Sequence, residues 1–134
     1  GRVTGPHSIP TLSRMGGRHP LHTTGVGKAL LATRDAESLD TFLTRTLERE
    51  TVHSIVDAGL LRAELDEARR RGYATTRQEM TLGNVSVAAA IPEVAGLPPA
   101  AVGVVTHLAK ADERRLSRLV VDAARAIARD LGRS

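Results

Sequence analysis

A glycine-rich segment, Gly25-Val26-Gly27-Lys28, is the first place in this sequence where residue types suggest chemistry. A phosphate-binding loop needs a glycine five positions before the Gly-Lys pair and a hydroxyl after it, but His22 and Ala29 occupy those positions. Nucleotide hydrolysis is therefore not indicated. Gly25 and Gly27 leave the main chain uncovered where a helix is predicted to begin. Their region is either an anion site made of free amides or a turn that needs glycine for close packing.

Two histidines and a serine are the other candidates for catalysis or metal binding. His19 and His22 are three residues apart, but Pro20 separates them and no carboxylate is near, which favours structural roles. Ser86 lies in an apolar run without the Gly-x-Ser-x-Gly frame of a hydrolase, and its hydroxyl needs a backbone or ligand partner. Glu79 has no second acid at a catalytic spacing. These residues predict a binding pocket without metal or cofactor.

Length and composition predict the kind of domain that must position these residues. The chain has 134 residues, of which 41% are hydrophobic and 25% charged, as in a single folded domain. No stretch approaches the roughly 20 apolar residues of a membrane helix. The absence of cysteine excludes disulfides, thiol catalysis and zinc-thiolate sites. We therefore expect a soluble cytoplasmic domain with no membrane partner.

The charge distribution argues against direct nucleic-acid binding. The formal net charge is +4, and no acidic residue precedes Asp35. All basic residues except Lys28 and Lys110 are arginines, which we attribute to a coding bias. Only Phe42 and Tyr73 are aromatic, so stacking on bases is nearly excluded. Solvated surface arginines are the favoured interpretation.

Hydrophobic periodicity predicts alternating strands and helices. Strands are expected at Ser8–Met15, Tyr73–Gln78, Val85–Ile91 and Ala101–Leu108. Helices are expected at Lys28–Ala32 after a Thr24 cap, after Asp35, after Asp57, and over Asp112–Leu131. Pro10 demotes the first strand to a sheet edge, and the last two strands are expected to pair antiparallel. The prediction is an α+β fold with a largely antiparallel sheet flanked by helices.

The last two helices carry the clearest signals. Three arginines followed by Gly72 predict the end of the third helix. In the last helix one apolar face is predicted, consisting of Leu116, Leu119, Val120, Ala123, Ile127 and Leu131. This face is expected to cover the sheet.

Three segments resemble the C-terminal effector-binding domain of IclR-type bacterial transcriptional regulators. Residues 16–32, GGRHPLHTTGVGKALLA, are similar to that family's GxxLPLHATAxGKALLA. Residues 61–74, LRAELDEARRRGYA, resemble LxxELxxxRxxGYA, and residues 82–89, LGNVSVAA, stand where the family has xGxxCxAAPV. The resemblance extends from about Arg14 to Gly132 in the same order.

The resemblance implies a GAF/profilin-like domain over residues 1–134 that is not an enzyme. Such a domain senses a small-molecule effector, expected to be a carboxylate, and forms a homodimer or homotetramer. In the family a winged helix-turn-helix precedes this domain and reads operator DNA. That module is absent from this chain, and the first elements of the effector domain are also expected to lie upstream of Gly1. Operator DNA is then a partner only through the missing N-terminal domain.

The resemblance also assigns the effector site. Its walls would be Thr11 and His19, its floor the amides of Gly25 and Val26, and its strand side Thr76, Asn84, Ser86, Gly103 and Val105. Gly103 and Val105 replace two serines frequent in the family, which predicts an acid with a hydrocarbon or aromatic body.

Two alternatives remain at this stage. A small hydrolase or lyase would use His19, His22 and Ser86. A ligand-free dimerisation module would have its pocket filled by side chains, and the glycines at positions 25 and 103 argue against it by leaving room.

Overall fold

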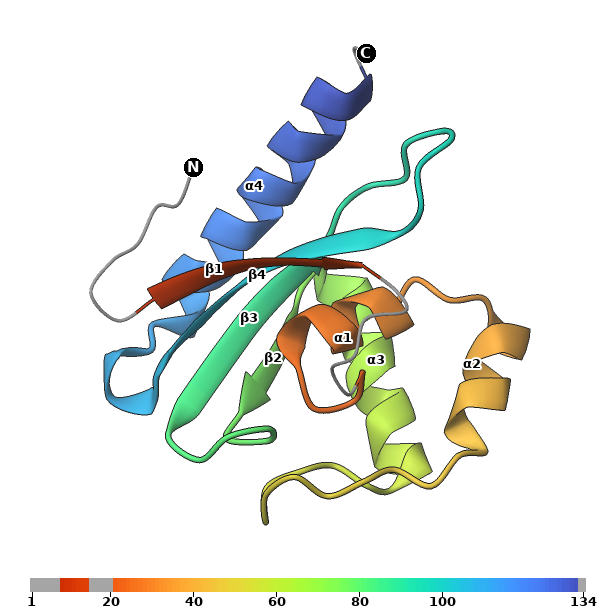
Figure 1. Ribbon diagram of the computed structural model, residues 1–134, viewed down its shortest axis with the longest axis vertical. Helices are drawn as coiled ribbons and strands as arrows, with labels where there is room; N and C mark the ends of the chain where they lie inside the picture. The colour runs from red at the N-terminus through yellow and green to blue at the C-terminus, as the bar shows by residue number, and fades with distance from the viewer. Residues whose placement is uncertain (1–7, 15–20, 133–134) are drawn as a thin grey trace.

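The computed structural model describes residues 21–132 together with the backbone of residues 8–14 (Figure 1). Four antiparallel strands form one sheet in the order β1-β4-β3-β2. Their bounds are Ser8–Arg14 for β1, Ala74–Arg77 for β2, Asn84–Ala90 for β3 and Ala100–His107 for β4. The predicted α+β class, the edge position of β1 and the antiparallel pairing of β3 with β4 are confirmed.

Helices cover both faces of this sheet, as Figure 1 shows. They are α1 (Gly25–Leu31), α2 (Ala36–Leu43), α3 (Ala58–Arg71) and α4 (Glu113–Gly132), with a 3-10 turn at Leu108–Lys110. Helix α1 contacts all four strands on one side, and α4 lies against β3 and β4 on the other. The helix α1 is therefore the element through which the glycine-rich segment meets the sheet.

The predicted helix starts are confirmed by their capping contacts. The side chains of Thr24, Asp35 and Asp57 each accept a hydrogen bond from an amide in the first turn that follows, at 3.0, 2.7 and 2.9 Å. Helix α1 begins at Gly25, earlier than the predicted Lys28, because Thr24 is its N-cap. The main chain of Gly25 and Gly27 thus belongs to the helix itself.

Gly72 ends α3 in the left-handed conformation, with φ of 91°. We expect Gly72→Ala to lower the free energy of unfolding by about 1–2 kcal/mol, because a side chain at positive φ is strained. No atom lies within 4 Å of an added Cβ, so the cost is conformational and not steric. Urea unfolding followed by circular dichroism measures it. Gly72→Asn should cost less, since asparagine tolerates this conformation, and equal losses for both variants would contradict the explanation.

Alternating strand residues divide the core into two layers. Ala88 and Ala101 face α1 and the helices beside it, while Val87 and Ala89 pack against Val120 and other apolar residues of α4. The residues under α1 are small, which lets this helix lie close to the sheet.

The predicted face of α4 is partly wrong. Leu119 and Leu131 are 52% and 42% exposed, whereas Ser117, Val120 and Ala124 are buried. Helix α4 packs on the sheet through Val120 and Ala124, with Leu116 and Val121 beside them, so Leu119 lies on the side turned away from the sheet.

Candidate functional site

A chain of hydrogen bonds joins the start of α1 to the sheet. The Gly25 amide donates to Ser86 Oγ at 3.0 Å, and Ser86 Oγ is hydrogen-bonded to Thr76 Oγ1. Thr76 and Ser86 are direct neighbours in the β2–β3 register. Three residues that the resemblance assigned to the effector site therefore lie together. The Ser86 hydroxyl has the backbone partner that a buried hydroxyl in an apolar strand requires.

Several hydrogen-bond donors at this point are not used. Two hydroxyls share one bond between Ser86 and Thr76, so one of their two protons is left over. Among the described residues, no acceptor contacts the Val26 amide, which lies in the first turn of α1. Two residues before Gly25, the buried hydroxyl of Thr23 has no hydrogen-bond partner in the part of the chain that the structure describes. Such a set of donors suits a ligand with negative or acceptor oxygens.

The glycines at positions 25 and 103 serve close packing. An added Cβ at Gly25 would lie 2.8 Å from Ser86 Oγ. At Gly103 it would lie 2.9 Å from the Ala88 Cβ and 3.1 Å from Val26 Cγ1. The expectation that both glycines leave open space is therefore wrong, because side chains of β3 occupy the space at Gly25, and Ala88 and Val26 occupy it at Gly103. The interpretation of the segment as a closely packed turn describes its steric role better.

The remaining predicted residues lie at different distances from this cluster. Val105 is the β4 neighbour of Ser86, so it lies in the same cross-strand row, and Asn84 begins β3 opposite His107. The backbone of Thr11 pairs with Gly103. His19 and the side chain of Thr11 lie outside the described residues.

His22 has a structural role. Its ring is buried, and Nε2 lies 2.6 Å from the Glu48 carbonyl oxygen. Ser86 is bonded to Gly25 and Thr76 instead, so no His22–Ser86 nucleophile pair is formed. Within the part of the chain that the structure describes, no three potential metal ligands come together.

A buried ionic cluster was missed by the sequence reasoning. Lys28 is 2% exposed, and its Nζ lies 2.6 Å from Glu79 Oε1 and 3.1 Å from Glu64 Oε1. It also donates to the Thr75 carbonyl at 3.3 Å. The cluster ties α1 to α3 and to the end of β2. The available signal was a lysine within the otherwise apolar run that follows Gly27.

The loop between α2 and α3 holds the turn that carries Glu79. Ser54 Oγ donates to the Glu79 carbonyl and accepts the amide protons of Glu50 and Thr51 at 3.0 and 2.9 Å. Thr51 Oγ1 donates to the Gln78 carbonyl. The carboxylate of Glu79 is thus fixed from its main chain as well as by Lys28.

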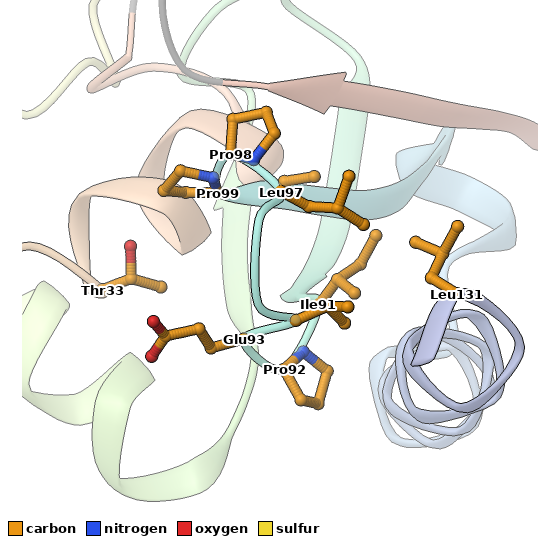
Figure 2. Close-up of a pocket in the computed structure, with 10 residues that line it drawn as sticks. Thr33, Ile91, Pro92, Glu93, Leu97, Pro98, Pro99 and Leu131 are labelled. Atoms are coloured by element: carbon orange, nitrogen blue, oxygen red, sulfur yellow. The ribbon is translucent and has the colours of Figure 1, made fainter. Parts of the chain in front are cut away.

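Two hollows lie away from this cluster. One, of about 300 Å³, is next to the β3–β4 connection and Leu131 (Figure 2). The other, of about 400 Å³, lies between α1 and α3 and shares Thr33 with the first. Neither is lined by a residue that the resemblance assigned to the effector site.

Comparison with known proteins gives consistent matches. Residues 1–133 match the family model for the C-terminal domain of the bacterial transcriptional regulator IclR. The transcriptional repressor AllR of Klebsiella pneumoniae is 40% identical over 91 residues, covering 67% of this chain and 34% of AllR. The regulator KdgR of Dickeya chrysanthemi is 36% identical over 83 residues, covering 61% of this chain and 27% of KdgR. The chain therefore spans about a third of the length of these relatives.

Solved structures show the same fold. Thermotoga maritima IclR is 32% identical with a TM-score of 0.82, over 97% of this chain and 54% of that one. The C-terminal domain of Escherichia coli KdgR is 24% identical with a TM-score of 0.82, over 94% and 88%. The inducer-binding domain of PobR from Acinetobacter, in complex with 3-hydroxybenzoic acid, is 28% identical with a TM-score of 0.73, over 87% and 67%. The GAF-like fold predicted from the resemblance is confirmed.

These matches also bear on the enzyme alternative. The relatives are transcriptional regulators and not enzymes, so the hydrolase or lyase alternative has no support.

No helix in the described part of the chain is long and apolar enough to span a membrane.

Proposed function

The chain belongs to the IclR family of bacterial transcriptional regulators, as its C-terminal domain, and on that premise we propose that it binds a small organic carboxylate as effector. The observation that supports this most directly is the donor set where α1 meets the sheet. Among the described residues, the Val26 amide and one proton of the Ser86–Thr76 pair lack acceptors there, and the buried hydroxyl of Thr23, two residues before Gly25, has no partner. A carboxylate accepts several such bonds at once.

Binding at the Gly25 amide requires an exchange of partners. Ser86 Oγ holds that amide now, and a carboxylate oxygen would replace it. A neutral hydrogen bond contributes about 1 kcal/mol and a charge-assisted one about twice as much, so the exchange favours the anion. The released Ser86 hydroxyl can then donate to the same carboxylate.

The apolar side of the site favours a ligand with a hydrocarbon or aromatic body. Val105 lies in the cross-strand row of Ser86, and Gly103 contributes no polar side chain. The PobR domain named above was solved with 3-hydroxybenzoic acid, a small aromatic carboxylate. Following the resemblance, we assign Thr11 and His19 to the walls of the proposed site and Asn84 to its strand side.

The effector would act on the assembly of the whole regulator. We place this domain as a single effector-binding unit in a cytoplasmic homodimer or homotetramer, with operator DNA bound by a winged helix-turn-helix outside this chain. An effector shifts such an assembly only through its difference in affinity between two arrangements.

We expect small aromatic carboxylates to raise the melting temperature of the domain, and their neutral primary amides to raise it much less. Gly25→Val should abolish the shift, because the new side chain would meet Ser86 Oγ, and far-UV circular dichroism checks that the variant is still folded. The matched control is Gly59→Val, at the exposed start of α3, which should retain the shift. Equal shifts with acids and amides would contradict the role of charge. Binding that persists in Gly25→Val would contradict the location of the site.

A further inference from the structure

The hollow beside the β3–β4 connection is separate from the proposed effector site. It lies where β3 ends and β4 begins, at the opposite end of β3 from Asn84 and Ser86. Its walls come from Thr33 just after α1, from Leu131 in the last turn of α4, and from residues 91–100 (Figure 2). Its volume of about 300 Å³ is at the lower end of the range for small-molecule pockets.

The polar and apolar groups of the hollow are on different sides. Figure 2 shows Glu93 and Thr33 on one side of the hollow, with the Thr33 hydroxyl pointing away from the Glu93 carboxylate, and the side chain of Leu131 on the other side. Leu97 and Leu131 remain 47% and 42% exposed, so no other part of the described chain covers them. A ligand that fits this division has one polar end and one apolar body.

Several main-chain positions that line the hollow have no amide proton to offer a ligand. Pro92, Pro98 and Pro99 have no amide proton. The Ile91 and Leu97 amides already donate to Ala100 and Val94, at 2.9 and 3.1 Å. The Thr33 hydroxyl donates to the Leu30 carbonyl at 2.7 Å, which leaves its oxygen as an acceptor.

Glu93 supplies the only full charge among the lining residues. No ion pair involves its carboxylate within the described part of the chain. A carboxylate accepts hydrogen bonds and attracts a cation. The polar end of a fitting ligand is therefore a positively charged donor.

We propose that this hollow binds a small apolar primary amine, with the ammonium at Glu93 and the hydrocarbon body against Ile91, Leu97 and Leu131. The ligand class is opposite in charge to that of the proposed effector, so the two sites can be tested independently. Three prolines stiffen one wall, which lowers the conformational cost of binding.

The neighbouring hollow restricts where the ammonium can lie. Arg69 lines it, and its guanidinium is held by the carbonyls of Ala32 and Arg34 at 2.9 and 3.2 Å. This fixed positive charge disfavours a second cation beyond Thr33. Thr33 separates the two hollows, so the ammonium is expected on the Glu93 side of Thr33 and not on the Arg69 side.

Titration of the domain with phenethylamine, followed by heteronuclear NMR, tests the proposal. Saturable shifts are expected for amides of residues 91–100 and for Leu131. Phenethyl alcohol, the neutral analogue, should bind about threefold to tenfold more weakly, because Glu93 is solvent-exposed and its attraction is partly screened. Hydrocinnamate, which carries a carboxylate instead, should cause no shifts at this hollow.

Variants separate charge from packing. Glu93→Gln should reduce the affinity for phenethylamine about threefold to tenfold and leave the affinity for phenethyl alcohol unchanged. Glu37→Gln, at an exposed carboxylate in the first turn of α2, is the matched control and should change neither. Equal binding of amine and alcohol, or an unchanged amine affinity in Glu93→Gln, would overturn the proposal. Neither result depends on whether carboxylates bind at Gly25.

Discussion

Replacing Lys28 with methionine is expected to lower the free energy of unfolding by about 3–5 kcal/mol, because it leaves a buried carboxylate without its partner. Lys28 Nζ lies 2.6 Å from Glu79 Oε1, and the Glu79 side chain is only 8% exposed. Methionine fills nearly the same volume, so the loss would come from charge and not from a cavity. Urea unfolding of the purified domain, followed by far-UV circular dichroism, gives the value.

Two further variants identify the buried charge as the cause. Adding Glu79→Gln to Lys28→Met should restore at least about 1 kcal/mol, since it removes the uncompensated carboxylate. Glu64→Gln alone should cost under about 1 kcal/mol, because Glu64 is 35% exposed and water screens its charge. A double variant less stable than Lys28→Met would contradict this account.

The elements could be predicted because their signals are local. Thr24, Asp35 and Asp57 each cap a helix by accepting an amide hydrogen bond within the next three residues, and Gly72 ends α3 through its own backbone conformation. The antiparallel pairing of β3 with β4 could also be predicted, since a short connection favours antiparallel neighbours.

Contacts between distant parts of the chain could not be predicted in the same way. Helix α4 is amphipathic, yet the shape of the sheet selects which side of it packs, and Leu119 is left outside. Lys28 meets Glu79 only because α1 crosses the end of β2. No spacing along the chain carries that information.

The candidate site also has one part that the sequence predicted and another that only the fold determines. The residues assigned by resemblance include a group that the fold joins, namely Gly25, Thr76 and Ser86. The sequence predicted that the Ser86 hydroxyl needs a backbone or ligand partner, but it could not identify the Gly25 amide as that partner, because the two residues are 61 positions apart. Through this hydrogen bond, Ser86 Oγ accepts the Gly25 amide proton that we propose an effector oxygen would accept.

Gly27 is the position where a single methyl group is expected to do the most steric damage, at a cost of about 3 kcal/mol for Gly27→Ala. An added Cβ would lie 2.6 Å from Leu21 Cα and still closer to the Leu21 carbonyl oxygen. These are backbone atoms, so no rotation of a side chain can relieve the contact. The Cβ would also lie 2.6 Å from Thr24 Oγ1, which caps α1 by accepting the Gly27 amide proton.

Gly59→Ala in α3 is the matched control for this effect. There the only atom within 4 Å of an added Cβ is Asp57 Oδ1, at 3.2 Å, and it belongs to an exposed side chain. Alanine is favoured over glycine within a helix by about 1 kcal/mol, so this variant should be as stable as the parent or more so. If both alanine variants unfold at the same urea concentration, close approach of Leu21 is not the reason for glycine at position 27. If only Gly27→Ala is destabilised, the glycine-rich segment is explained by packing of α1, and anion binding there depends on the amides that this packing leaves exposed.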